Sequence, residues 1–167
     1  FADPVDAAAG SATRQLPAKY PSLPNARLEV KQIANLFQSD QVLVFEGREA
    51  SEQKIKKLRL DEYKRVHFAS HGAINEERPW LSALVLSSQD SAEDGYLTMQ
   101  EVFDLRLNAD LVVLSACNTG LGQQIRGEGV MGLARAFLRA GSSSVLASLW
   151  NVSDESTAQF MTGFYKN

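Results

Sequence analysis

Apolar and polar positions form alternating blocks along the chain, and these blocks predict helices and strands in turn. Short apolar runs that end in small polar residues predict strands at Gln41–Phe45, Arg65–Ser70, Trp80–Leu86, Ala109–Leu114 and Ser144–Trp150. Apolar residues near helical spacing predict helices at Ala26–Phe37, Ser51–Leu60, Leu97–Phe103, Glu128–Ala140 and Ser156–Tyr165. The first 25 residues show no such period and predict a long loop.

The order of these blocks favours an α/β fold. Strands that alternate with helices are typical of a mainly parallel sheet lying between helices and joined by right-handed crossovers. A chain of 167 residues is long enough to bury one proper core, so we expect a single domain. In such sheets, ligands bind where the strands end, at their carboxyl edge.

Several helix ends have local signals. Ser51 is placed to cap a helix, and Thr98 followed three residues later by Glu101 forms the pattern of a capping box. Gly141 follows the Glu128–Ala140 helix, where glycine commonly ends a helix. We interpret Glu128 as structural, because a carboxylate at a helix start is favoured by the helix dipole.

Two of the predicted strands end in residues that can carry chemistry. Cys117, the single cysteine of the chain, follows the Ala109–Leu114 run, and His71 follows the Arg65–Ser70 run. A cysteine nucleophile needs a nearby base to form its thiolate, and His71 is the candidate. A lone cysteine is most often a small buried apolar residue, but polar residues flank Cys117.

Two other interpretations of these residues remain open. His67, His71 and Cys117 together could form a His/His/Cys zinc site, although a fourth ligand is not apparent. His67 lies in the middle of its strand, where a hydrogen-bonded core histidine is the simpler interpretation. We therefore expect no metal and no cofactor.

Composition narrows the function classes. The chain is 44% hydrophobic and 22% charged, with a net charge of −3, as in ordinary globular proteins. The Lys54–Lys57 run is typical of a solvated helix face rather than of a nucleic-acid footprint. No apolar stretch is long enough to cross a bilayer and no signal peptide is apparent. One cysteine cannot form an internal disulfide, so we expect a cytoplasmic protein. From the charge pattern and the lengths of the apolar runs, we expect no direct contact with nucleic acid or with a membrane.

Four motifs, in order, resemble the CHAT domain, a branch of the caspase and separase group of cysteine peptidases. They are His67–Gly72 (HFASHG), Leu114–Gly120 (LSACNTG), Gly127–Gly141 (GEGVMGLARAFLRAG) and Ser148–Asp154 (SLWNVSD). The resemblance covers residues 26–165 and implies a caspase-like three-layer α/β/α sandwich with a mainly parallel sheet. The spacing from His71 to Cys117 is close to the roughly 50 residues that separate the two in caspases.

The resemblance also implies roles for individual residues. Cys117 resembles the nucleophile and His71 the general base and acid. Gly72 resembles the residue whose backbone N–H, with that of Cys117, holds the oxyanion. Asp154 resembles the acidic residue that separase-like enzymes place under the substrate's first side chain. The strand that ends at Trp150 would pair with the substrate backbone.

Asp154 and Trp150 each have a simpler interpretation. Asp154 stands just before a helix, where aspartate is a common cap, and Trp150 could belong to the core.

The segment Gly120–Gly127 directly follows the nucleophile and is rich in glycine, so we expect a mobile loop that gates the site. Arg126 within it is a candidate point of self-cleavage.

Taken together, the sequence predicts a cysteine endopeptidase that cuts a protein or peptide substrate after a basic residue. We expect residues 1–25 to form a loop and the end of a first strand, and residues 26–167 to form the peptidase domain. The resemblance implies that such a domain follows tetratricopeptide-like repeats in a longer chain and is regulated by that module or by a partner. The alternative is a CHAT fold that acts as a non-catalytic scaffold.

Overall fold

The computed structural model describes residues 1–4, 20–75, 77–89, 92–115, 117–118, 128–148 and 152–167. Its α-helices are α1 (Pro24–Ala34), α2 (Glu52–Lys57), α3 (Met99–Asp104), α4 (Glu128–Arg139) and α5 (Asp154–Lys166). Its strands are β1 (Arg65–Phe68), β2 (His71–Ala73), β3 (Ala83–Val85), β4 (Tyr96–Thr98), β5 (Leu111–Leu114), β6 (Cys117–Asn118) and β7 (Val145–Ala147). Short 3₁₀ turns lie at Ser39–Gln41, Gly47–Glu49, Leu60–Glu62 and Pro79–Leu81.

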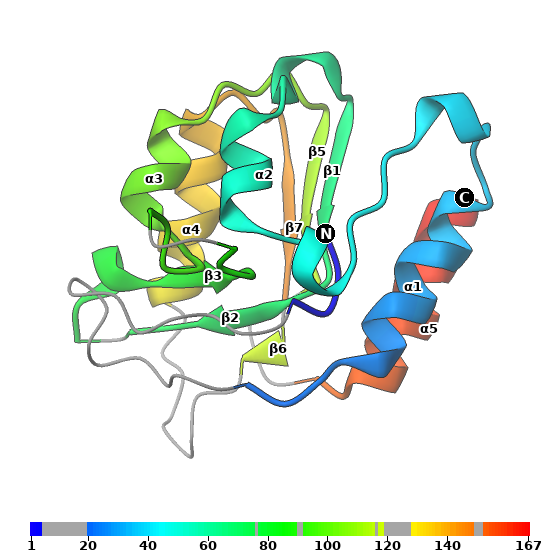
Figure 1. The fold of residues 1–167 in the computed structure, drawn as a ribbon, viewed down its shortest axis with the longest axis horizontal. Coiled ribbons are helices and arrows are strands. Elements are labelled where there is room, and N and C mark those ends of the chain that lie inside the picture. Colours follow the sequence, from blue (N-terminus) through cyan, green and yellow to red (C-terminus); the bar gives the residue numbers. More distant parts are fainter. Residues whose placement is uncertain (5–19, 76, 90–91, 116, 119–127, 149–151) are drawn as a thin grey trace.

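The main sheet is parallel and lies between two layers of helices. Its strand order is β1-β5-β7, with both pairs parallel. Helices α2, α3 and α4 lie on one side of it, and α1 and α5 lie side by side on the other (Figure 1). This arrangement confirms the expected α/β architecture and is compatible with a caspase-like α/β/α sandwich.

The central strand β5 shows why both faces of the sheet need a helix layer. Val112 and Leu114 belong to the large core that also contains Phe137 of α4, whereas Val113 packs with Ile33 of α1 and Met161 of α5. Alternate residues of a strand point to opposite faces, so an almost continuously apolar strand buries side chains on both sides. Val112 and Val113 are both fully buried, in agreement with that pattern.

A second sheet, of four short strands, lies beyond the carboxyl ends of β1 and β5. Its strand order is β4-β3-β2-β6. Strand β3 pairs antiparallel with β2 and with β4, while β2 pairs parallel with β6. The antiparallel pairs add to the parallel sheet that the alternating pattern predicts.

The local helix signals are confirmed. The Ser51 hydroxyl accepts a hydrogen bond from the Lys54 backbone N–H at 3.2 Å, and Thr98 and Glu101 form a reciprocal capping box at α3. Gly141 has φ +115°, and a Cβ there would meet the backbone of Leu107. These signals act within a few residues, so the sequence alone suffices to predict them.

Three predicted strands have different bounds in the structure. Gln41–Phe45 is not a strand, because it lacks a partner along most of its length. Among the described residues, Ala2 alone pairs at its end: the Ala2 N–H donates to the Phe45 carbonyl, and Ala2 forms a bridge with Glu46. In the Trp80–Leu86 run, Pro79 opens a 3₁₀ turn, so β3 starts only at Ala83. The Arg65–Ser70 strand ends at Phe68, and the chain then enters the second sheet at His71.

Candidate functional site

The two candidate catalytic residues lie opposite each other on adjacent strands. Strands β1 and β5 are neighbours in the main sheet, and each leads directly into a strand of the second sheet. There β2 and β6 run parallel, with His71 in register with Cys117. Neighbouring strands are about 4.8 Å apart, so the register brings the two backbones to that spacing. The structure describes Cys117 by its backbone alone.

The imidazole of His71 is held by the segment that precedes α1. Its Nε2 lies 2.7 Å from the carbonyl oxygen of Pro21, and its ring stacks on that of Tyr20 with centroids 5.1 Å apart. A carbonyl can only accept, so Nε2 carries the proton and donates it. In the neutral ring, Nδ1 is then the basic nitrogen. The His71 side chain is buried, with the residue only 1% exposed.

Gly72 lies in the middle of the second sheet. Its register partners are Leu84 of β3 on one side and Asn118 of β6 on the other. The backbone of Gly72 is thereby fixed next to that of the residue that follows Cys117. Strand pairing gives this glycine a rigid backbone, which a preorganised hydrogen-bond donor requires.

Asp154 is the first residue of α5, and its carboxylate caps a different helix. Its Oδ2 accepts a hydrogen bond from the Asn25 backbone N–H at 2.9 Å, in the first turn of α1. The N-cap of α5 itself is Ser153, whose hydroxyl accepts from the Ser156 N–H at 3.1 Å. The capping interpretation of Asp154 therefore applies to α1 rather than to α5.

Trp150, Arg126 and the Gly120–Gly127 segment lie outside the described residues. Their assigned roles in substrate pairing, self-cleavage and gating stay predictions.

His67 is a hydrogen-bonded core histidine. Its Nε2 lies 2.6 Å from Glu29 Oε1, and its Nδ1 lies 3.2 Å from the Tyr165 hydroxyl. Burial lowers the pKa of His67, an effect that the Glu29 carboxylate partly offsets, so the ring donates from Nε2 and accepts at Nδ1. Burial also raises the pKa of Tyr165 to about 12, which keeps that hydroxyl a donor. Both ring nitrogens serve protein groups, which argues against the zinc set of His67, His71 and Cys117.

A cluster of carboxylates lies elsewhere, around the ammonium group of Lys56. Nζ of Lys56 is 2.6 Å from Glu52, 2.6 Å from Glu93 and 2.8 Å from Glu101. Three carboxylates this close could hold a metal ion, but the Lys56 ammonium group already lies within 2.8 Å of all three and offsets part of their charge. Burial raises the pKa of Glu52 to about 7, although Lys56 acts in the opposite direction. We interpret the cluster as a clamp that ties α2 to α3.

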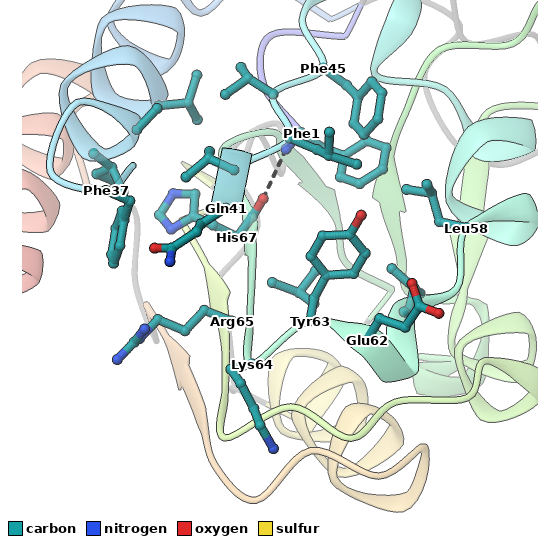
Figure 2. A pocket seen from close by; sticks show the side chains of 18 of the residues that line it. Phe1, Phe37, Gln41, Phe45, Leu58, Glu62, Tyr63, Lys64, Arg65 and His67 are labelled. Carbon is teal, nitrogen blue, oxygen red and sulfur yellow. Dashed lines mark hydrogen bonds between the residues drawn. The ribbon is translucent and has the colours of Figure 1, made fainter. Parts of the chain in front are cut away.

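A pocket of about 590 Å³ lies at the other end of β1. Its lining includes Lys64, Arg65 and His67 on one side and Phe45 on the other, and neither His71 nor Gly72 is part of it (Figure 2). Within its lining the backbone nitrogen of Phe1 donates to the His67 carbonyl at 3.0 Å (Figure 2). This pocket therefore does not serve the His71–Cys117 pair.

Sequence reasoning missed the carbonyl of Pro21, because every residue carries a backbone carbonyl and none is marked by its side chain. The proline lies in the aperiodic stretch that the sequence predicts as a loop. Only the folded chain brings it against a residue 50 positions away.

Comparisons with known proteins match the chain to one family model and to two relatives of the same name. A family model described as the CHAT domain matches residues 1–167. The chain is 39% identical over 71 residues to tetratricopeptide repeat protein 28 of Mus musculus, which covers 42% of this chain and 3% of that protein. It is 30% identical over 183 residues to the protein of the same name from Homo sapiens, covering 87% of this chain and 7% of that one. The chain thus spans less than a tenth of the length of these relatives.

Among the described residues, no helix has the length and apolar character needed to cross a membrane.

Proposed function

The chain belongs to the CHAT domain family, which is related to the caspase-like peptidases, and from this premise we propose that it is a cysteine endopeptidase with a His71–Cys117 dyad. The observation that carries the proposal is the register of β2 and β6, which sets His71 opposite Cys117 at the carboxyl edge of the fold. The hydrogen bond from Nε2 to Pro21 supports it, since this bond leaves Nδ1 as the basic nitrogen.

In this mechanism, Nδ1 of His71 takes the proton of the Cys117 thiol, and the thiolate attacks the carbonyl carbon of the scissile peptide. The backbone N–H groups of Gly72 and Cys117 stabilise the oxyanion, each contributing roughly 3 kcal/mol. The imidazolium gives its proton to the leaving amine, which breaks the peptide bond and leaves a thioester. Water, deprotonated by His71, then hydrolyses the thioester and restores the thiol.

Substrate selection is the second part of the proposal. Asp154 supplies a carboxylate beneath the residue before the cut, which favours arginine or lysine. The strand that ends at Trp150 pairs with the substrate backbone as an added strand. Because Asp154 also holds the first turn of α1, its charge is already placed and half-buried.

The name of the two relatives supports the proposal of a partner module. They are named for tetratricopeptide repeats, and the matched region is a small part of each. We propose that a similar helical-repeat module regulates this domain in a longer chain. A reducing cytoplasmic location is part of the same proposal, since it keeps a lone catalytic thiol reduced.

The competing function is a non-catalytic scaffold, and the burial of His71 favours it. Labelling with a peptidyl acyloxymethyl ketone that has arginine before the reactive group separates the two. Because Cys117 is the single cysteine, mass spectrometry of the intact chain locates any thioether without ambiguity. We expect one adduct, absent in Cys117→Ala and strongly slowed in His71→Ala. A wild-type chain that stays unlabelled, even with its repeat module present, would support the scaffold.

A further inference from the structure

The carboxylate of Asp3 is the centre of a hydrogen-bond cluster just beside the candidate dyad. It accepts from the Leu23 backbone N–H at 2.6 Å, from Nε of Arg27 at 2.6 Å and from the Ser22 hydroxyl at 3.1 Å. The Asp3 side chain is 1% exposed. A buried carboxylate with three donors is costly to place and strongly directional, so it fixes the segment that donates to it.

The same residue is tied to the strand that leads to His71. The Asp3 backbone N–H donates to the Ala69 carbonyl at 3.0 Å, and the Ala69 N–H donates to the Phe1 carbonyl at 2.8 Å. Asp3 therefore holds its position relative to Ala69, which follows β1 and lies two residues before His71.

Asp3 also adopts an uncommon backbone conformation. With φ +42°, it is the one non-glycine residue of the described chain in the left-handed region. Such conformations are strained for residues with a side chain and persist where the surroundings enforce them. Here the left-handed residue is the one whose N–H pairs with Ala69 and whose carboxylate accepts from Ser22 and Leu23.

These contacts close a ring through the site. It runs from His71 back along the chain to Ala69, across to Asp3, through the Asp3 carboxylate to Leu23, and back by Pro21 to His71 Nε2. The carbonyl of Pro21 precedes the anchored residues directly. The Asp3 carboxylate therefore binds the two residues that follow the carbonyl in contact with Nε2 at 2.7 Å.

We propose that Asp3 is a positioning residue for His71: it fixes the Pro21 carbonyl against Nε2 and thereby selects the tautomer whose Nδ1 accepts the Cys117 proton. The inference rests on the proposed peptidase dyad. Asp3 does not touch the reacting atoms and acts through Ser22, Leu23 and Pro21. Stacking of the Tyr20 ring on His71 restrains the imidazole plane, but it does not select which nitrogen carries the proton.

The decisive variant is Asp3→Asn. Asparagine tolerates the left-handed conformation nearly as well as aspartate, so this change removes the charge without straining the backbone. Asp61→Asn is the matched control, because it makes the same charge change at a half-exposed carboxylate that pairs with exposed Arg59 and lies outside the Asp3 cluster. Ser22→Ala is a second, milder test, since it removes a single exposed donor from the cluster.

The first measurement is the ¹⁵N spectrum of the imidazoles. The chain has two histidines, and His67, held by Glu29 and Tyr165, is an internal reference. In the wild type we expect His71 to show one tautomer protonated at Nε2. In Asp3→Asn we expect mixed tautomers at His71 with His67 unchanged, and a smaller change in the same direction in Ser22→Ala.

The second measurement is the alkylation rate of Cys117 by iodoacetamide at neutral pH. We expect Asp3→Asn to slow it about 3- to 10-fold, the scale of one ordinary hydrogen bond, with Asp61→Asn unchanged. A folded Asp3→Asn protein with the wild-type tautomer and alkylation rate would overturn the positioning role. If His71→Ala leaves the alkylation rate unchanged, the dyad itself is wrong, and the tautomer measurement still decides the role of Asp3. If Asp3→Asn fails to fold, an unchanged His71 spectrum in Ser22→Ala overturns the positioning role.

Discussion

The carboxylate of Glu29 accepts a hydrogen bond from Nε2 of His67 at 2.6 Å, across the interface between α1 and β1. Both side chains are buried, at 2% and 12% exposure. The Tyr165 hydroxyl completes the chain of bonds from α5. One polar network therefore joins the two outer helices to the edge strand of the main sheet.

Removing the acceptor of this network should destabilise the fold. In Glu29→Ala, the buried Nε2–H of His67 loses its partner, so we expect the free energy of unfolding to fall by about 1–3 kcal/mol. Glu29→Gln keeps an oxygen at the same position and should lose less. Urea unfolding followed by tryptophan fluorescence measures both. Equal midpoints for Glu29→Ala and the wild type would mean that the network contributes nothing.

Glu52 should make the stability depend on pH. Its pKa is raised from 4.5 to about 7 in the folded chain, so between these pH values the native state binds more protons than the unfolded state. The contribution of Glu52 is therefore fully present below pH 4.5 and is lost as pH rises toward 7.

The buried His67 changes the stability with pH in the opposite direction to Glu52, within part of the range from pH 4.5 to 7. Its lowered pKa contributes stability that is present above 6.5 and is lost as pH falls. The test is thus the difference between the wild type and Glu52→Gln in urea unfolding from pH 4.5 to 7.5. We expect the stability of the wild type relative to the variant to decrease steadily with pH. A flat difference would contradict the raised pKa.

Gly141 should resist substitution, whereas Gly163 should not. Alanine at position 141 would be strained at φ +115° and would meet the Leu107 backbone, so we expect a loss of about 2 kcal/mol or more. Gly163, inside α5, has no atom within 4 Å of an added Cβ, so alanine there should stabilise the chain by about 0.5 kcal/mol. Melting temperatures of the two variants should move in opposite directions. A neutral Gly141→Ala would show that the turn can rearrange.

Two substitutions of Asp154 should separate its contribution to stability from its proposed role in substrate preference. Asparagine can still accept the Asn25 N–H, so Asp154→Asn should change the stability little, while Asp154→Ala should lose about 1 kcal/mol with the cap. In peptide-library profiling of the activated enzyme, Asp154→Asn should lose the preference for arginine or lysine before the cut. A preference for leucine or methionine, unchanged in Asp154→Asn, would refute the basic-residue pocket and leave the dyad intact.

The sequence predicts the parts of this fold that depend on near neighbours along the chain. The caps at Ser51 and Thr98, and the buried strand β5, need only a few consecutive residues. Gln41–Phe45 has the composition of a strand and fails to be one, because a strand also requires a partner that no local pattern reveals.

The candidate site divides in the same way. His71 and Cys117 stand out because their side chains are chemically distinctive and end apolar runs. The Pro21 carbonyl and the Asp3 cluster act through backbone groups and contacts between distant residues. Only the folded structure brings these groups to His71.

Helices α1 and α5 run in the same direction, since Asn25 meets Asp154 near their starts and Gln32 meets Thr162 farther along (Figure 1). Both helices therefore turn their amino-terminal ends, each equivalent to about half a positive charge, toward the Pro21–His71 side of the molecule. At this end the two helix dipoles partly offset the negative charges of Asp3 and Asp154, whose carboxylates accept from backbone N–H groups at the start of α1. The parallel helices thereby lower the cost of holding two carboxylates in one place, and added salt should weaken this effect.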